Sequence, residues 1–205
     1  MTTKIKLNSA SGGGSFSLQA PSSSANTRVM TLPDTADGTI LTTTNPKSGN
    51  ILQVVHVNSN THMTSTATSY TDLTGITATI TPASTSNKIL IVCNIAISKE
   101  ANHSFLGRIV RDGSAISGSG GVIESGHTNQ EAGVWWLVRT TVHDTHPSVV
   151  HYLDSPATTS ATTYKAQGKT SDSSQGFALN RTKGSSNQSY ASPTFSSITL
   201  WEVAA

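Results

Sequence analysis

The residues best suited to chemistry gather in one short stretch, VHDTHPSVVHYLD, at residues 142–154. It holds three histidines and two aspartates, and imidazole and carboxylate groups are common ligands of zinc and iron. In an extended chain, the odd spacing of His143 and His146 sends them to opposite faces, and Pro147 predicts a turn. We therefore interpret His143, His146 and His151 as polar loop and strand-end residues. The alternative is a metal site in which a threefold axis collects one histidine from each of three chains.

Other catalytic arrangements lack support in the sequence. Serines are frequent, but no G-x-S-x-G motif marks a nucleophile. The eleven Asp and Glu residues are scattered, and no pair stands out for the two-carboxylate chemistry of glycosidases. The GSGG segment at 118–121 lacks the lysine and the strand-to-helix context of a phosphate-binding loop. We predict a protein that is not an enzyme and that uses no cofactor.

Binding through exposed loops is a second possibility for function. Aromatic rings can stack on sugars, and the Ser- and Asn-rich tracts could bond to sugar hydroxyl groups. Because aromatic residues make up only 5% of the chain, core packing is the competing interpretation for each ring. The candidate rings are Tyr152, Tyr164, Tyr190 and Trp201.

Composition favours an all-β protein. Serine and threonine together make up about 30% of the 205 residues, and charged residues only 12%, so strong helix formers are scarce. The net charge is +2 and the basic residues are scattered, which argues against nucleic-acid binding. The N-terminal MTTKIKLNS lacks the apolar core of a secretory signal, and no segment has the length of a membrane span. We expect synthesis in a bacterial host cytoplasm, without membrane insertion.

The most apolar run, KILIVCNIAIS at residues 88–98, is predicted to be the central strand. Apolar side chains occupy both alternating faces, which is typical of a strand buried on both sides. Cys93, the single cysteine, lies within this run and is predicted to be a buried, unreactive thiol.

Alternation and turn residues predict further strands along the chain. Asp112-Gly113 predicts a hairpin turn after 105–111. No convincing helix appears, so we predict an antiparallel β-sandwich of jelly-roll type. The other predicted strands cover residues 51–57, 69–73, 76–82, 134–143, 149–154, 162–167 and 197–203.

Residues 1–47 differ from the rest of the chain. They hold only short apolar pieces, at 4–7, 15–19, 28–32 and 39–41, separated by turn formers such as GGG and PDTADG. So few apolar residues cannot build a core, and disorder is the alternative. We predict an extended N-terminal β arm at 1–47 and a head domain at 48–205.

Two groups of segments resemble tail-fibre and related virion proteins of tailed bacteriophages, particularly those of aquatic bacteria. One is FSLQAPSSSANTRVMTLPDTADGTIL at 16–41, which is similar to a unit of their shafts and arms. The other is SYTDLTGITATITPASTSNKILIVCNIAIS at 69–98, with GRIVRDGSAI at 107–116 and YLDSPATTSATTYKAQ at 152–167, which resembles their C-terminal sandwich domains. Fibres, spikes and capsid decoration proteins share such modules.

The resemblance implies a homotrimeric virion structural protein. Its arm would attach to other virion proteins of the capsid or tail, and its head would face solvent for adhesion to the host, with a surface glycan as a possible partner. A short fibre or spike is preferred, with a capsid decoration protein as the alternative and a soluble carbohydrate-binding module as the alternative from another class. The residues predicted to form the core or a trimer interface are Ile89, Ile91, Ile95, Trp135 and Trp136.

Overall fold

The computed structural model describes residues 4–19, 22–25, 27, 46–99, 104–116, 135–138, 145–174, 176–183 and 193–205. The chain separates into two compact units, Met1–Ile40 and Leu41–Ala205. The predicted boundary at 47/48 lies near the start of the second unit. The predicted strands at 28–32 and 39–41 lie outside the described residues.

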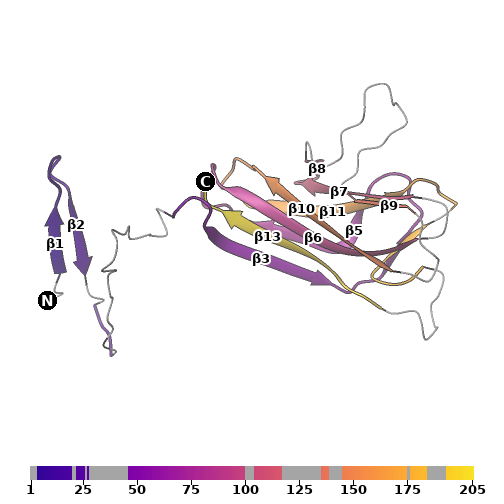
Figure 1. The fold of residues 1–205 in the computed structure, drawn as a ribbon, viewed down its shortest axis with the longest axis horizontal. Helices are drawn as coiled ribbons and strands as arrows, with labels where there is room; N and C mark the ends of the chain where they lie inside the picture. The colour runs from indigo at the N-terminus through magenta and orange to yellow at the C-terminus, as the bar shows by residue number, and fades with distance from the viewer. Residues whose placement is uncertain are drawn as a thin grey trace, which may run out of the picture. The chain divides into compact units, whose positions relative to one another are not determined.

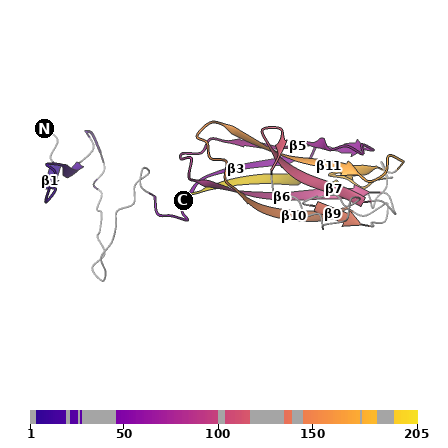
Figure 2. The ribbon, with the colours of Figure 1, turned by 90° about the horizontal axis from the view of Figure 1, so that it is seen from above.

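The second unit is an antiparallel β-sandwich, which confirms the predicted fold class (Figures 1 and 2). The described residues contain no helix. The first sheet has the order β3-β13-β6-β12-β4, and β10 pairs with β6 along its other edge. Its strands are β3 (Ile51–Ser59), β4 (Met63–Ser65), β6 (Lys88–Lys99), β10 (His146–Asp154), β12 (Phe177–Leu179) and β13 (Ser196–Val203).

The second sheet has the order β5-β11-β7-β8, with β9 also paired to β7. Its strands are β5 (Thr71–Ile80), β7 (Ser104–Arg111), β8 (Ser114–Ala115), β9 (Trp135–Val138) and β11 (Thr162–Thr170). Asp112 and Gly113 join β7 to β8 with φ angles of 49° and 84°. Two consecutive positive φ angles are what a type I′ turn requires, so the predicted hairpin is confirmed.

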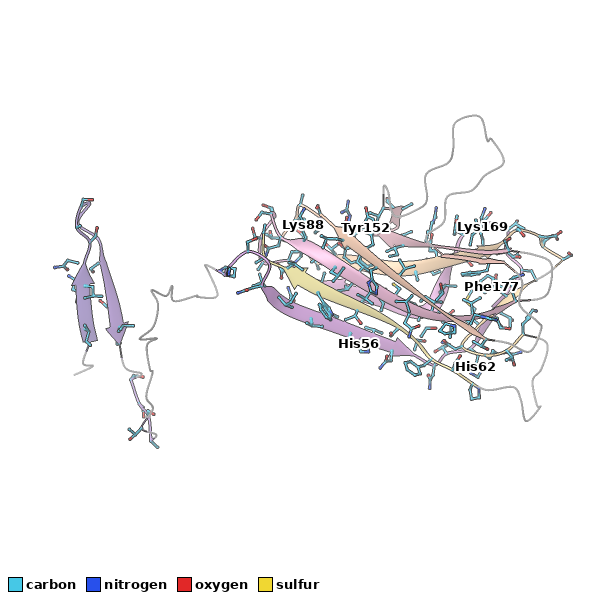
Figure 3. The ribbon with its side chains drawn as sticks, viewed as in Figure 1. His56, His62, Lys88, Tyr152, Lys169 and Phe177 are labelled. Carbon is cyan, nitrogen blue, oxygen red and sulfur yellow. The ribbon has the colours of Figure 1, made fainter. Side chains whose placement is uncertain are left out.

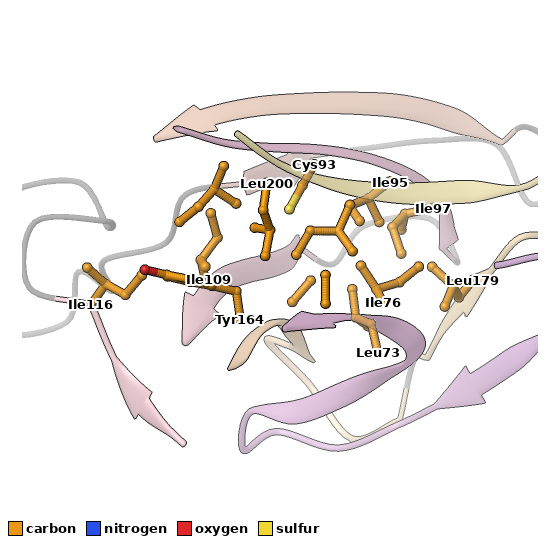
Figure 4. Packing of buried hydrophobic residues seen from close by; sticks show 14 of the residues in the cluster. Leu73, Ile76, Cys93, Ile95, Ile97, Ile109, Ile116, Tyr164, Leu179 and Leu200 are labelled. Atoms are coloured by element: carbon orange, nitrogen blue, oxygen red, sulfur yellow. The ribbon is translucent and has the colours of Figure 1, made fainter. Parts of the chain in front are cut away.

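The core lies between the two sheets and follows from strand alternation (Figure 4). Every second residue of β6 points inward and is almost completely buried, from Ile89 to Ile97, with Cys93 in the middle. Alternating residues of β5 and β11, including Ile76 and Tyr164, close the core from the other sheet. Ile89, Ile91 and Ile95 are therefore core residues of a single chain.

Polar groups also join the two sheets. Asp154 of β10 is almost fully buried and accepts hydrogen bonds at Oδ2 from Tyr164 Oη, at 2.7 Å, and from Arg111 Nη1, at 2.8 Å. Tyr164 and Arg111 belong to the opposite sheet. Burial, followed by the hydrogen bond to the Asp154 carboxylate, raises the pKa of Tyr164, so this hydroxyl stays protonated as a donor.

Several predictions about single elements need correction. The central strand is buried on both faces only near its end, because Leu90, Val92 and Asn94 lie half-buried on the outer side of the sheet. Pro147 does not form a turn. It lies within β10, which is paired on one side only among the described strands, and an unpaired edge tolerates a residue without an N–H group.

The break expected between 73 and 76 is a bulge inside one strand. Strand β5 runs through it, while the register with β11 shifts between Lys165 and Gln167. Gly75 has a φ of 80° there, and a Cβ atom would lie 2.3 Å from Ser59 Oγ. Glycine is therefore required at this position. Two strands of three residues each, β4 and β12, were not predicted because they are too short to show a pattern.

Candidate functional site

The histidine-rich stretch forms no shared site in the described structure. His146 and His151 both lie in β10, where their odd spacing places them on opposite faces of the sheet, with His146 half-buried and His151 exposed. His143 lies outside the described residues. In the part of the chain that the structure describes, no group of three or more His, Cys, Asp or Glu residues could hold a metal ion.

Cys93 is completely buried between the sheets. Burial raises the pKa of its thiol to about 12, because the low-dielectric core disfavours the thiolate. The thiolate is the nucleophilic form, so Cys93 is a packing residue.

The four aromatic candidates for sugar binding divide by position. Tyr164 is buried and Tyr152 packs against the core, with Tyr152 visible on β10 in Figure 3. Trp201 remains 38% exposed on β13. Tyr190 lies outside the described residues, as do the side chains of Trp135 and Trp136, although the backbone of these two residues forms part of β9.

The outer face of the first sheet carries an apolar row that crosses four strands. Trp201 lies opposite Val54 on one side and Leu90 on the other, and Leu90 lies opposite Leu153. Val54 and Leu153 are each more than half exposed. Directly paired side chains on one sheet face pack against each other, so these four form a continuous strip. We call Val54, Trp201, Leu90 and Leu153 the apolar row.

The next row on this face is mostly polar and consists of His56, Thr199, Val92 and His151. His56 of β3 bonds to Thr199 Oγ1 at 2.7 Å and to Asn58 Oδ1 at 2.9 Å (Figure 3). Thr199 pairs with Val92, which pairs with His151. His56 and His151 are thus three strand spacings apart, roughly 14 Å, too far to share a ligand within one chain.

The N-terminal unit presents a second apolar surface. Strands β1 (Lys4–Asn8) and β2 (Ser15–Gln19) form an antiparallel hairpin in which Ile5 pairs with Leu18. Ile5, Leu7 and Leu18 lie on one face and are 64%, 58% and 39% exposed. We call these three residues the apolar hairpin face. An isolated two-stranded hairpin is marginally stable in water, so its apolar side favours contact with another surface.

Sequence reasoning found the strands that carry both surfaces but not the surfaces themselves. Alternation in β2 is visible in the sequence, whereas the pairing of Ile5 with Leu18 is a property of the register. The apolar row joins residues from four strands that are distant in the chain. No sequence window contains it.

No helix of the described structure is long and apolar enough to cross a membrane. No protein-family model matches this chain, and no curated protein shows significant similarity to it.

Proposed function

We propose that this chain is a non-enzymatic structural protein of a bacteriophage particle, in which the N-terminal arm attaches to another virion protein and the sandwich is displayed to solvent for adhesion to the host. The observation that carries the proposal is the apolar hairpin face. It lies in a unit separate from the sandwich, and the described core residues of the sandwich all belong to the second unit. The resemblance of 16–41, and of 69–98, 107–116 and 152–167, to virion proteins supports the same assignment.

Docking of the arm combines two interactions. Burial of Ile5, Leu7 and Leu18 supplies the hydrophobic part, at about 1.5–3 kcal/mol for each side chain fully buried. Among the described residues, β1 and β2 pair only with each other, so their outer edges offer main-chain hydrogen bonds to a neighbouring sheet. A short fibre or spike is the preferred position on the particle.

The proposal includes a homotrimer that forms through the outer face of the first sheet. The two rows described above contain no Asp, Glu, Lys or Arg residue, so copies of the chain can meet there without repulsion between such charges. Lys88, at the end of β6, lies beyond the apolar row. Three copies would combine weak contacts with a receptor through effective concentration.

The trimer is tested by light scattering coupled to chromatography at micromolar concentration. We expect a species of about 64 kDa, three times the 21.4 kDa chain. Leu153→Glu should shift it to 21.4 kDa, because three buried carboxylates would approach one another. Thr79→Glu, on an exposed position of the other sheet, is the matched control. A wild-type monomer would rule out the trimer, and a Leu153→Glu trimer would rule out this interface.

The attachment role is tested on particles of the phage that encodes the chain, by immunogold labelling with an antibody against the sandwich. We expect label on wild-type particles and at least a roughly tenfold loss in the double variant Ile5→Asp/Leu18→Asp, because two apolar contacts are lost together. The control is Ser17→Asp/Gln19→Asp, which adds the same charge on the polar face of the hairpin. It should keep the label.

The place of the label also decides among the alternatives. Label on the tail or its fibres supports adhesion, and label spread over the head would make the chain a capsid decoration protein. Particles without label would overturn the virion role and favour a soluble carbohydrate-binding module. Equal loss in both double variants would show that the apolar hairpin face is not the docking surface.

A further inference from the structure

The outer face of the second sheet holds a guanidinium group that is fixed by its neighbours and whose Nη groups have no acceptor among the described residues. We infer that Arg108 binds the carboxylate of an acidic sugar at this position. The inference rests on the proposed function as a displayed adhesion domain and gives its receptor a chemical class.

Two neighbours, Gln167 and Tyr70, hold Arg108 in place. Gln167 of β11 lies directly opposite Arg108 and accepts a hydrogen bond from its Nε at 2.8 Å. Gln167 is itself oriented, since its Nε2 donates to Asp72 Oδ1 at 2.7 Å. The Tyr70 ring lies under the guanidinium, with 4.2 Å between its centroid and Arg108 Cζ. An arginine stacked on a ring and bonded at Nε has lost most of its side-chain freedom before any ligand arrives.

The end of the same guanidinium makes no hydrogen bond to any residue that the structure describes, and the side chain is half-buried. The remaining donors keep the planar fork geometry that matches two carboxylate oxygens. A lysine at this position would keep the charge but lose the fork.

Neighbouring charges favour an anion. Lys169 Nζ lies 5.1 Å from the centroid of the same Tyr70 ring (Figure 3). Burial and then the charge of Arg108 lower the pKa of Lys169, which shows that the two cations lie close together. Asp72 already accepts hydrogen bonds from Lys165 and Gln167, so its charge is compensated locally. Among the described residues around Arg108, positive charges therefore outnumber negative ones.

The surrounding surface favours a sugar over a simple carboxylate. Thr77 and Thr79 of β5 are exposed on this face, and Thr163 of β11 lies beside them, with 2.8 Å between Thr79 Oγ1 and Thr163 Oγ1. These hydroxyl groups follow Arg108 along the sheet in successive rows. A sugar chain anchored by its carboxylate can exchange hydrogen bonds with them.

The test is isothermal titration of the full-length protein at physiological salt with tetragalacturonate. Its fully methyl-esterified form keeps the hydroxyl groups and lacks the charges, and a tetraglutamate peptide keeps the charges and lacks the sugar. We expect binding of tetragalacturonate alone. Arg108→Lys should weaken it about tenfold, because the paired hydrogen bonds of the fork are lost while the charge remains.

Lys88→Gln is the control, since it removes a positive charge from the other sheet. It should leave the affinity unchanged, and unfolding curves should show both variants folded. Absence of binding, equal binding of the ester or of the peptide, or an unchanged affinity in Arg108→Lys would each overturn the inference. None of these binding results would change the conclusion drawn from the particle labelling. Unlabelled particles together with intact tetragalacturonate binding would remove the virion role but keep the site.

Discussion

Replacing Asp154 with alanine is expected to lower the free energy of unfolding by about 2–4 kcal/mol. The substitution leaves the buried hydroxyl of Tyr164 without its acceptor and removes the partner of Arg111. Breaking a buried ion pair costs up to about 5 kcal/mol, but the Arg111 side chain is one-third exposed and water can replace part of the lost contact. Urea denaturation followed by circular dichroism measures the change.

An exposed ion pair of similar length is the matched control. Lys165 Nζ lies 2.7 Å from Asp72 Oδ2, and both side chains are more than one-third exposed. Asp72→Ala should cost less than about 1 kcal/mol, because solvent screens the pair. If Asp154→Ala costs no more than Asp72→Ala, the contact between the two sheets contributes little to stability.

Replacing Glu202 with glutamine is expected to lower the free energy of unfolding at pH 7 by about 2–3 kcal/mol. Glu202 is fully buried at one end of the sandwich. Its carboxylate accepts hydrogen bonds from Ala83 N at 2.7 Å, from Asn87 Nδ2 at 2.6 Å and from Gln53 Nε2 at 2.6 Å. These bonds connect β3, β13 and the loop that precedes β6. Glutamine offers one acceptor oxygen in place of two.

The same substitution should flatten the acid dependence of stability. Burial by itself would raise the pKa of Glu202, but the hydrogen bonds from Asn87, Gln53 and the backbone outweigh burial and lower it below its ordinary value. A carboxyl group with a lowered folded-state pKa stabilises the fold above its unfolded pKa. This stabilisation is lost as the pH falls through the folded pKa.

Denaturant midpoints between pH 7 and pH 3 test this expectation. The difference between the wild-type and Glu202→Gln curves isolates the titration of this one group. We expect the difference to shrink as the pH falls. Parallel curves would show that the Glu202 carboxyl keeps the same pKa in the folded and unfolded chains.

Strands with a clear two-residue alternation of apolar and polar side chains were predictable, because this pattern can be seen in consecutive residues of the sequence. The inward series of β6 and the alternation of β11 follow from a spacing of two, which places successive side chains on opposite faces. The turn at Asp112-Gly113 was predictable because these residues tolerate positive φ. Short strands such as β12 were not predictable, because three consecutive buried residues show no alternation that distinguishes a strand from other buried segments.

Composition and strand alternation establish the class of the chain: it is rich in hydroxyl groups, poor in helix formers and built from alternating strands, with a distinct N-terminal segment. Which outward-facing residues become neighbours depends instead on strand pairing, which no single segment specifies. Arg108 contacts Tyr70 across β11. Trp201 of β13 lies opposite Leu90 of β6, although more than a hundred residues separate them in the chain. Strand register explains the difference, because a shift of one residue turns a whole strand over and only the packed core selects the register.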